Sequence, residues 1–201
     1  MAVALATIIV VMAVAGSSLA WLKETTPAIT NTFTEGLVDI DLYEHKYENG
    51  ALTGTIIRDD SNSYKMVPGS VLPKDPTVTV LAESEACWLF VKVDEINDVN
   101  TFLSYAIADG WTQGDGTNIP SNVYYRKVDD TNVEQVFYVL KADSNNTYPH
   151  GAVTVNSGVT MTDMKGLSAA NYPKLQFTAY AIQAASFDNV ANAWAEVQVS
   201  P

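Results

Sequence analysis

Cysteine, histidine and positive charge are all scarce in this chain of 201 residues. The single cysteine, Cys87, excludes an intrachain disulfide, so the fold is not one of the disulfide-stapled secreted domains. The 11 lysine and arginine residues stand against 23 aspartate and glutamate residues, which gives a net charge of −12 at pH 7. That acidity argues against binding to nucleic acid or to anionic lipid surfaces, because both carry negative charge themselves.

The two histidines, His45 and His150, lack the sequence neighbours of a catalytic metal site. In zinc proteases of the HExxH type, a helix places both imidazoles on one face beside a general base. Here His45 lies in EHKYE, near the expected end of a strand, and His150 lies in the loop YPHG. Serine hydrolases need a GxSxG motif that is missing, and Cys87 opens an apolar strand where burial raises the pKa of a thiol. We therefore expect no catalytic residues, no metal site and no cofactor.

The N-terminal segment is apolar and carries no charge over residues 1–15. Its length suits the hydrophobic region of a secretory signal and falls short of the ~20 residues of a membrane-spanning helix. Ser18 and Ala20 then occupy the minus-three and minus-one positions of a signal peptidase site before Trp21, where only small side chains fit. We predict export, with cleavage between Ala20 and Trp21.

Residues 1–20 are accordingly interpreted as a signal peptide or an apolar N-terminal segment that meets the membrane only transiently. A signal usually begins with lysine or arginine, whereas the first basic residue here is Lys23. The expected reason is a longer precursor, and a retained pilin-like N-terminal helix is the alternative. In either case we expect the remaining chain at the cell surface or in the extracellular matrix.

The rest of the chain shows period-two alternation far more often than helical spacing. In residues 38–42, for example, Val38, Ile40 and Leu42 share one face, which predicts a half-buried strand. Further strands are predicted at residues 52–57, 77–81, 87–93, 123–128, 136–141, 152–156 and 174–183. Short helices are predicted at residues 100–108, with Asn100 as the cap, and at residues 188–196. The pattern predicts an all-β fold, an antiparallel β-sandwich over residues 37–201 with one or two short helices.

Two groups of residues invite a ligand-binding interpretation, and each has a structural alternative. Acidic clusters at residues 59–62, 129–132 and 143–146 offer oxygen ligands for Ca²⁺, but turns use the same side chains, and none has EF-hand spacing. Aromatic residues could form a sugar-binding platform, but aromatics between apolar strand residues usually belong to the core. We expect turns and core packing. The aromatic residues are Trp88, Trp111, Tyr124, Tyr125, Tyr180 and Trp194.

Four stretches of the sequence carry a resemblance to a known family. They are SLAW, NTFTEGLVDIDL, YKMVPGSVLPKDPTVTV and KLQFTAYAIQAASFDNVANAWAEV, and in this order they span nearly the whole chain. The chain resembles the TasA and camelysin family of exported Gram-positive proteins, whose signals are cut by a dedicated signal peptidase and which build biofilm matrix fibres. The resemblance implies a jelly-roll sandwich whose subunits assemble by strand exchange.

The segment of residues 21–36 has the composition of an extended arm. It is rich in β-favouring threonine, and Pro27 opposes a helix, so after cleavage its backbone groups are free to pair with another chain. We expect the arm to dock into a second copy. Donor and acceptor surfaces differ, so such contacts run head to tail and generate a filament. The alternative is that the arm folds back as a strand of its own subunit. The expected assembly residues are Trp21, Leu22, Ile29, Thr32 and Phe33.

The sequence therefore predicts a structural subunit of extracellular or cell-surface fibres that is not an enzyme. Its expected partners are identical subunits, with other matrix proteins as further candidates. The first alternative is a monomeric surface adhesion or ligand-binding module. The second is a metalloprotease of the camelysin type, which the family resemblance raises and the positions of His45 and His150 oppose.

Overall fold

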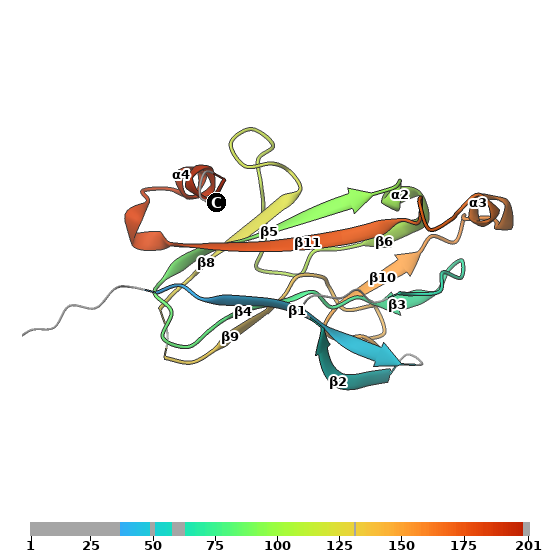
Figure 1. Cartoon of the computed structure of the whole chain (residues 1–201), viewed down its shortest axis with the longest axis horizontal. Coiled ribbons are helices and arrows are strands. Elements are labelled where there is room, and N and C mark those ends of the chain that lie inside the picture. Colours follow the sequence, from blue (N-terminus) through green and yellow to red (C-terminus); the bar gives the residue numbers. More distant parts are fainter. Residues whose placement is uncertain (1–36, 49–50, 58–62, 131, 199–201) are drawn as a thin grey trace, which may run out of the picture. The chain divides into compact units, whose positions relative to one another are not determined.

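The computed structural model describes residues 37–48, 51–57, 63–130 and 132–198, which fold mostly into antiparallel β-sheets (Figure 1). The strands are β1 (Ile40–Glu48), β2 (Ala51–Ile57), β3 (Val71–Pro73), β4 (Thr77–Val80), β5 (Cys87–Ile96), β6 (Leu103–Tyr105), β7 (Thr112–Gln113), β8 (Val123–Val128), β9 (Gln135–Tyr138), β10 (Ala152–Val155) and β11 (Lys174–Gln183). The helices are α2 (Val99–Phe102), α3 (Met161–Lys165) and α4 (Val190–Val197), with a 3₁₀ turn, η1 (Ala184–Ser186). No helix in these described ranges is long and apolar enough to cross a membrane.

The described strands form three sheets, and every pairing between them is antiparallel. The sheet orders are β2-β1-β4-β9, β3-β10-β6 and β11-β5-β8-β7. The longest ladder joins β11 to β5, from Lys174 opposite Ile96 to Gln183 opposite Cys87. This ladder fixes the position of β11, which borders the candidate site described below.

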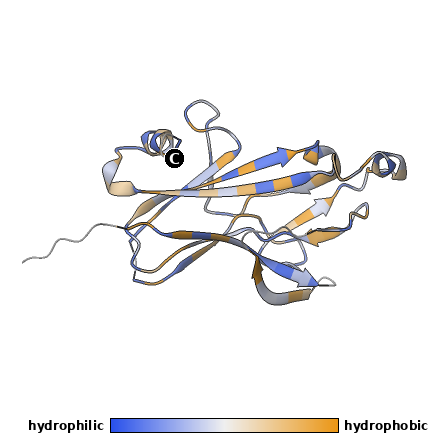
Figure 2. Ribbon diagram, in the orientation of Figure 1, coloured by the Kyte–Doolittle hydropathy of each residue, from blue (hydrophilic) through white to orange (hydrophobic). Residues whose placement is uncertain are grey.

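The main core lies between the two four-stranded sheets. Val78 and Val80 of β4 pack in one buried cluster with Leu89 and Val91 of β5. The intervening residue Phe90 faces the other side of β5, where its ring lies 5.2 Å from that of Trp194 on α4. Strand β5 is therefore buried on both faces over its apolar part, as its sequence predicted. Figure 2 shows apolar and polar residues alternating toward the carboxyl end of β5, where its burial decreases.

Most predicted strands are confirmed, and β8 and β11 have the predicted bounds. The helix predicted at residues 100–108 is wrong beyond its first turn. Leu103 and Tyr105 pair with Val155 and Val153 of β10, so sheet hydrogen bonds replace the helix after Phe102. The N-cap residue is Asp98, not Asn100. The sequence also gave no indication of three short strands or of one helix, namely β3, β6, β7 and α3.

Candidate functional site

Strand β11 is the longest of the described strands that lie at the edge of a sheet. Among the described strands, β11 pairs only with β5, and it does so along all ten of its residues. Its other edge therefore presents backbone N–H and C=O groups with no strand beside them in this part of the chain. The strand contains no proline, and Lys174 is its only charged residue. Beyond Lys174, the strand therefore has neither the proline nor the charged side chains that often protect an edge from pairing with another strand.

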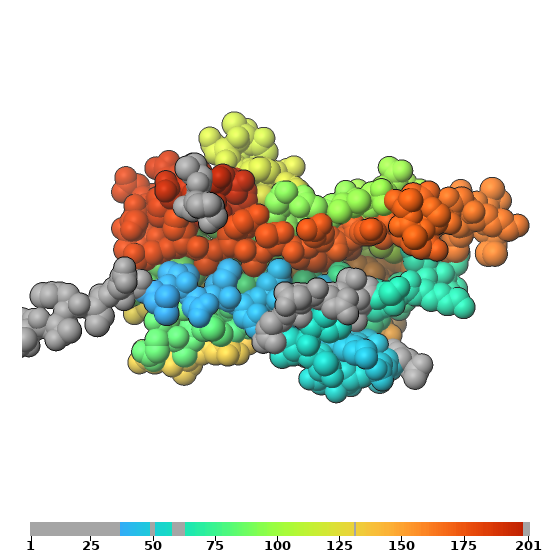
Figure 3. All heavy atoms as spheres, in the orientation of Figure 1, coloured from blue at the N-terminus to red at the C-terminus, as the bar shows by residue number. Residues whose placement is uncertain are grey.

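A groove of about 810 Å³ lies beside the amino-terminal half of β11. Strand β11 lies close to β1, and their surfaces run next to each other in Figure 3, yet no ladder between the two is found among the described strands. The walls of the groove come from β1, β3, β6, β10, β11 and the α3 region, and most of them are apolar. They include Leu42, Leu72, Leu103, Met164, Leu175 and Phe177. The groove thus offers apolar side-chain contacts alongside a free backbone edge.

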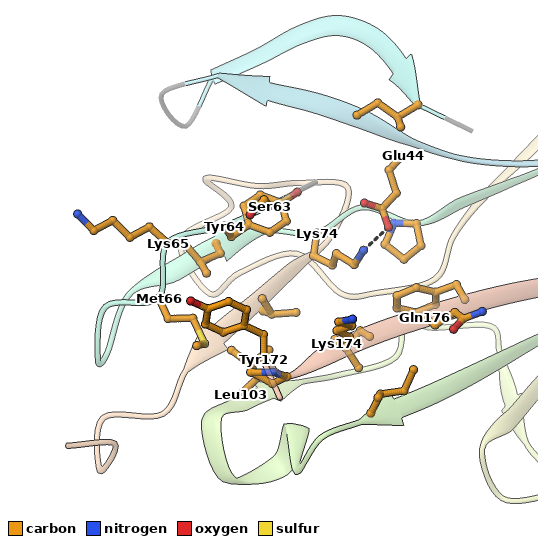
Figure 4. Close-up of a pocket in the computed structure, with 18 of the residues that line it drawn as sticks. Glu44, Ser63, Tyr64, Lys65, Met66, Lys74, Leu103, Tyr172, Lys174 and Gln176 are labelled. Atoms are coloured by element: carbon orange, nitrogen blue, oxygen red, sulfur yellow. Dashed lines mark hydrogen bonds and ion pairs between the residues drawn. The ribbon is translucent and has the colours of Figure 1, made fainter. Parts of the chain in front are cut away.

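The polar residues of the groove include an ion pair and a tyrosine with a buried hydroxyl. Lys74 forms an ion pair with Glu44, with 15% and 17% of the two side chains exposed, and Figure 4 shows the pair inside the groove. The Lys74 Nζ atom also lies 5.3 Å from the centre of the Phe177 ring on β11, in cation–π range. Lys74 therefore connects the β1 side of the groove to the β11 side.

Tyr64 supplies the buried hydroxyl of the groove. Its hydroxyl is buried and has no hydrogen-bond partner among the described residues. Burial and the nearby charge of Glu44 raise the pKa of Tyr64, so the phenol remains a hydrogen-bond donor at neutral pH. A buried hydroxyl without a partner costs free energy, and a strand entering the groove would bring backbone carbonyls that accept its hydrogen bond.

Helix α3 forms part of the wall of the groove. A capping box begins it, in which the Asp163 N–H donates to Thr160 Oγ1 at 3.3 Å and the Thr160 N–H donates to Asp163 Oδ2 at 2.7 Å. Met164 lines the groove, whereas Met161 on the same helix does not line it and is 68% exposed. Met164 therefore lies on the side of α3 that faces the groove, and Met161 lies on the side that faces solvent.

The sequence did not predict this groove, because its walls come from segments far apart along the chain. The alternation of β11 was recognised, but the absence of a second neighbouring strand depends on tertiary structure. The predicted cleavage and arm residues lie outside the described residues. They are Ser18, Ala20, Trp21, Leu22, Ile29, Thr32 and Phe33.

A second cluster lies beside the groove and contains both histidines. His45 belongs to β1, Asp75 lies between β3 and β4, and His150 comes just before β10. One potential ligand atom from each residue lies within 4.8 Å of the other two. Neither histidine has the sequence neighbours of a zinc-protease motif, but the fold brings both histidines beside Asp75. Tertiary structure supplies the neighbours that local spacing lacks.

Asp75 is the centre of this cluster and is fully buried. Its Oδ2 atom lies 2.7 Å from His45 Nδ1 and accepts a hydrogen bond from the Tyr47 hydroxyl at 3.3 Å. Its Oδ1 atom accepts the His45 backbone N–H at 3.2 Å. Burial raises the pKa of Asp75, while the hydrogen bonds from His45 oppose that shift. Burial and the charge of Asp75 raise the pKa of Tyr47, so its hydroxyl remains a donor.

His150 reaches the cluster because the chain approaches itself closely at Gly151. The Lys74 N–H donates to the Gly151 carbonyl at 3.1 Å, and a Cβ atom on Gly151 would lie only 2.4 Å from the Lys74 carbonyl oxygen. Gly151 also has a φ of +147°, which favours glycine. The His150 ring stacks on Tyr138, with ring centres 4.4 Å apart. Its Nδ1 atom is buried and has no hydrogen-bond partner within the described part of the chain.

Several other residues considered in the sequence have structural roles, while the acidic cluster at residues 59–62 lies outside the described residues. Cys87 is fully buried in the main core, and burial raises the pKa of its thiol to about 11, as expected for an unreactive cysteine. Asp143 accepts the backbone N–H groups of Asn145 and Tyr148, so its cluster is a turn. The aromatic residues considered for sugar binding are all at least partly buried.

Comparison with known proteins found no protein-family model that matches the chain and no curated protein with a matching sequence. The groove, the edge of β11 and the histidine cluster are therefore the features that indicate what the protein does.

Proposed function

We propose that this chain is a structural subunit of extracellular or cell-surface fibres, in which identical subunits join head to tail by donor-strand exchange. In this proposal the chain is exported and residues 1–20 are a signal peptide or apolar segment. Residues 21–36 of one copy then pair with the outer edge of β11 in the next copy. The antiparallel sheets are arranged as a jelly-roll sandwich, no reaction is catalysed, and other matrix proteins are further candidate partners.

The observation that carries this proposal is the combination of an open ten-residue edge with an apolar groove beside it. Strand addition gains affinity from main-chain hydrogen bonds and specificity from pockets that receive alternate side chains. The β11 edge supplies the first and the groove supplies the second. The Tyr64 hydroxyl, which lacks a partner among the described residues, adds a hydrogen-bonding group for the incoming backbone.

The length and pattern of the arm fit this acceptor. At about 3.3 Å per residue, the ten residues of β11 extend over about 33 Å and an arm of residues 21–36 reaches about 53 Å. In an extended arm, Ile29 and Phe33 point to the same face because side chains alternate. We propose that these two apolar side chains enter the groove, and that Thr32 faces the opposite side.

The first experiment compares chains that begin at Trp21 and at Gly36, using negative-stain electron microscopy. Filaments are expected only from the longer chain, because only it carries the donor arm. Circular dichroism and thermal unfolding check that the shorter chain keeps its fold. Filaments formed equally well by a folded chain beginning at Gly36 would contradict the proposal.

A matched pair of substitutions tests which face of the arm enters the groove. Phe33→Asp places a carboxylate on the proposed buried face and is expected to abolish filaments, because a charge would have to enter an apolar groove. Thr34→Asp introduces the same negative charge on the opposite face and is expected to keep them. Equal loss in both variants would contradict the proposed orientation.

A further inference from the structure

We propose that His45, Asp75 and His150 bind a divalent transition-metal ion with the coordination chemistry of Zn²⁺. Their potential ligand atoms lie within 4.8 Å of one another, although the three residues come from separate segments of the chain. A metal ion bonded at about 2 Å to each ligand fits such a separation after small side-chain movements. This site goes beyond fibre assembly and does not depend on it.

The donor set selects the class of metal. Two imidazoles and one carboxylate suit Zn²⁺ and related transition metals, and three protein ligands leave a fourth position for water. Ca²⁺ instead requires six to eight oxygen ligands, and Mg²⁺ requires an octahedral arrangement of oxygens. Asp75 is the one carboxylate in this cluster, so the cluster does not fit either of these hard cations.

The state of His150 provides an independent observation that points to a ligand. Its Nδ1 atom is buried, and no described residue bonds to it. A buried ring nitrogen without a partner pays a desolvation cost that a bound ion would remove. One of its ring nitrogens already lies within 4.8 Å of the ligand atoms of His45 and Asp75, and the ring is stacked on Tyr138 with an angle of 9° between the two rings. Little side-chain freedom would therefore be lost on binding.

The surroundings of Asp75 resemble the supporting shell of a metal site. The Tyr47 hydroxyl and the His45 backbone N–H both donate to the carboxylate and fix its orientation. The rings of Tyr43 and Tyr138 lie against His45 and His150 respectively, which reduces access of water. In the absence of metal, the 2.7 Å contact between His45 Nδ1 and Asp75 Oδ2 is a hydrogen bond, and the ion would take its place.

Binding would join three segments of the fold at one point. The ion would link β1, the connection before β4 and the connection before β10. Strands β1 and β4 belong to one sheet and β10 belongs to another, so the ion would join two sheets. Glu44 lines the groove, and the next residue, His45, points to the other face of β1 because strand side chains alternate. Tyr43 lies against the His45 ring and also lines the groove, so the two sites are tested through residues that only one of them uses, Met164 for the groove and His150 for the metal site.

The experiment titrates the full chain, first freed of metal with a chelator, with Zn²⁺ in competition with a chromophoric chelator. One equivalent is expected to bind saturably, and His45→Gln and His150→Gln are each expected to weaken affinity by at least about 100-fold, because each removes a ligand. Asp109→Asn is the matched control for nonspecific binding to an acidic protein, since its carboxylate is 93% exposed. This control is expected to bind like the original chain.

Two further readouts distinguish coordination from a structural role of the histidines. Zn²⁺ is expected to raise the thermal unfolding midpoint of the original chain and of Asp109→Asn but not of His150→Gln. Co²⁺ is expected to give a visible absorption band that His150→Gln lacks. Should His45→Gln fail to fold, the loop variant His150→Gln still provides the test. Absence of saturable Zn²⁺ binding, or unchanged affinity in a folded His150→Gln, would overturn the proposal.

Discussion

Glu44 and His45 are neighbours on β1, yet their side chains belong to two different environments. Glu44 meets Lys74 inside the groove, where both side chains remain partly exposed. His45 meets Asp75 on the other face, where the carboxylate is fully buried. The two pairs use consecutive residues, Glu44 and His45 in one segment and Lys74 and Asp75 in the other. They lie apart because neighbouring side chains of a strand point to opposite faces.

The two environments differ in how completely they are built without a partner molecule. In the histidine cluster, both oxygens of Asp75 accept hydrogen bonds and aromatic rings surround the imidazoles. The groove has apolar walls, an open backbone edge and a buried phenol with no partner among the described residues. Each environment keeps one buried polar atom without a partner among the described residues, the Tyr64 hydroxyl in the groove and His150 Nδ1 in the histidine cluster. The proposals assign a peptide strand to the first and a metal ion to the second.

The largest expected effect on stability comes from the histidine face. Asp75→Ala removes a fully buried carboxylate and leaves the His45 N–H and the Tyr47 hydroxyl without their acceptor. We expect a loss of about 3 kcal/mol of unfolding free energy in metal-free protein, measured by urea denaturation. Asp109→Ala, at an exposed position, is expected to change it by less than about 0.5 kcal/mol. A loss of unfolding free energy in Asp75→Ala as small as that in Asp109→Ala would show that the histidine face of β1 is not the more stabilising one.

A charge on the groove wall is expected to affect assembly rather than stability. Met164→Glu places a carboxylate where the arm would dock, while Met161→Glu places one on the exposed side of the same helix. We expect Met164→Glu to raise the critical concentration for filament formation by about 10- to 100-fold, since burial of a methionine contributes about 1.5–3 kcal/mol. Met161→Glu should leave it nearly unchanged, and Zn²⁺ affinity should be the same in both. Equal effects of the two changes on assembly would show that this wall is not the docking surface.

The ion pair between Glu44 and Lys74 is expected to contribute less to stability than the buried carboxylate of Asp75. Lys74→Met deprives Glu44 of its cation at a partly exposed position, for which we expect a loss of about 1 kcal/mol. Lys141→Met, which breaks the more exposed pair with Asp109, should cost close to nothing. Chemical denaturation of both variants measures the difference. A loss at Lys74 as large as that at Asp75 would make the two faces energetically alike.

The smallest expected effect is a pH dependence at the start of α3. The Thr160 hydroxyl and N–H donate to Asp163 and lower the pKa of that carboxyl below its usual value. Because the folded pKa is lowered, the cap contributes stability above about pH 4 and loses it as the pH falls through the folded pKa. The Thr160 amide signal in NMR should shift in that range, and Asp163→Asn should remove the transition. A Thr160 signal that titrates identically in Asp163→Asn would contradict this assignment.

The sequence predicted the strands best where apolar and polar residues alternate regularly over many positions. Strand β11 has the predicted bounds because Leu175, Phe177, Ala179 and Ala181 alternate strictly toward the core. The helix predicted from Phe102 and Tyr105 failed beyond one turn, since Tyr105 gains sheet hydrogen bonds to β10 that local spacing does not reveal. Short strands such as β7 have too few residues to show any period.

The candidate sites were less predictable because they are assembled from distant segments. His45 and Asp75 are 30 positions apart, and neither lies near His150 in the sequence. Local patterns report which face of a strand a residue occupies, but not which other segment covers that face. The groove likewise depends on the absence of a described neighbour beside β11, and a strand's own residues do not encode that absence.

The most direct test of the account is site-specific cross-linking between two differently labelled copies. One copy carries cysteine at Thr30, Thr32 or Thr34, and the other carries cysteine at Gln176 or Thr178 on β11, while the buried Cys87 stays unreactive. The account predicts that at least one arm position forms a disulfide with β11 of the other copy, and that a control cysteine at Asn118 forms none. Cross-links formed only within one copy, or as often at Asn118 as at β11, would contradict donor-strand exchange.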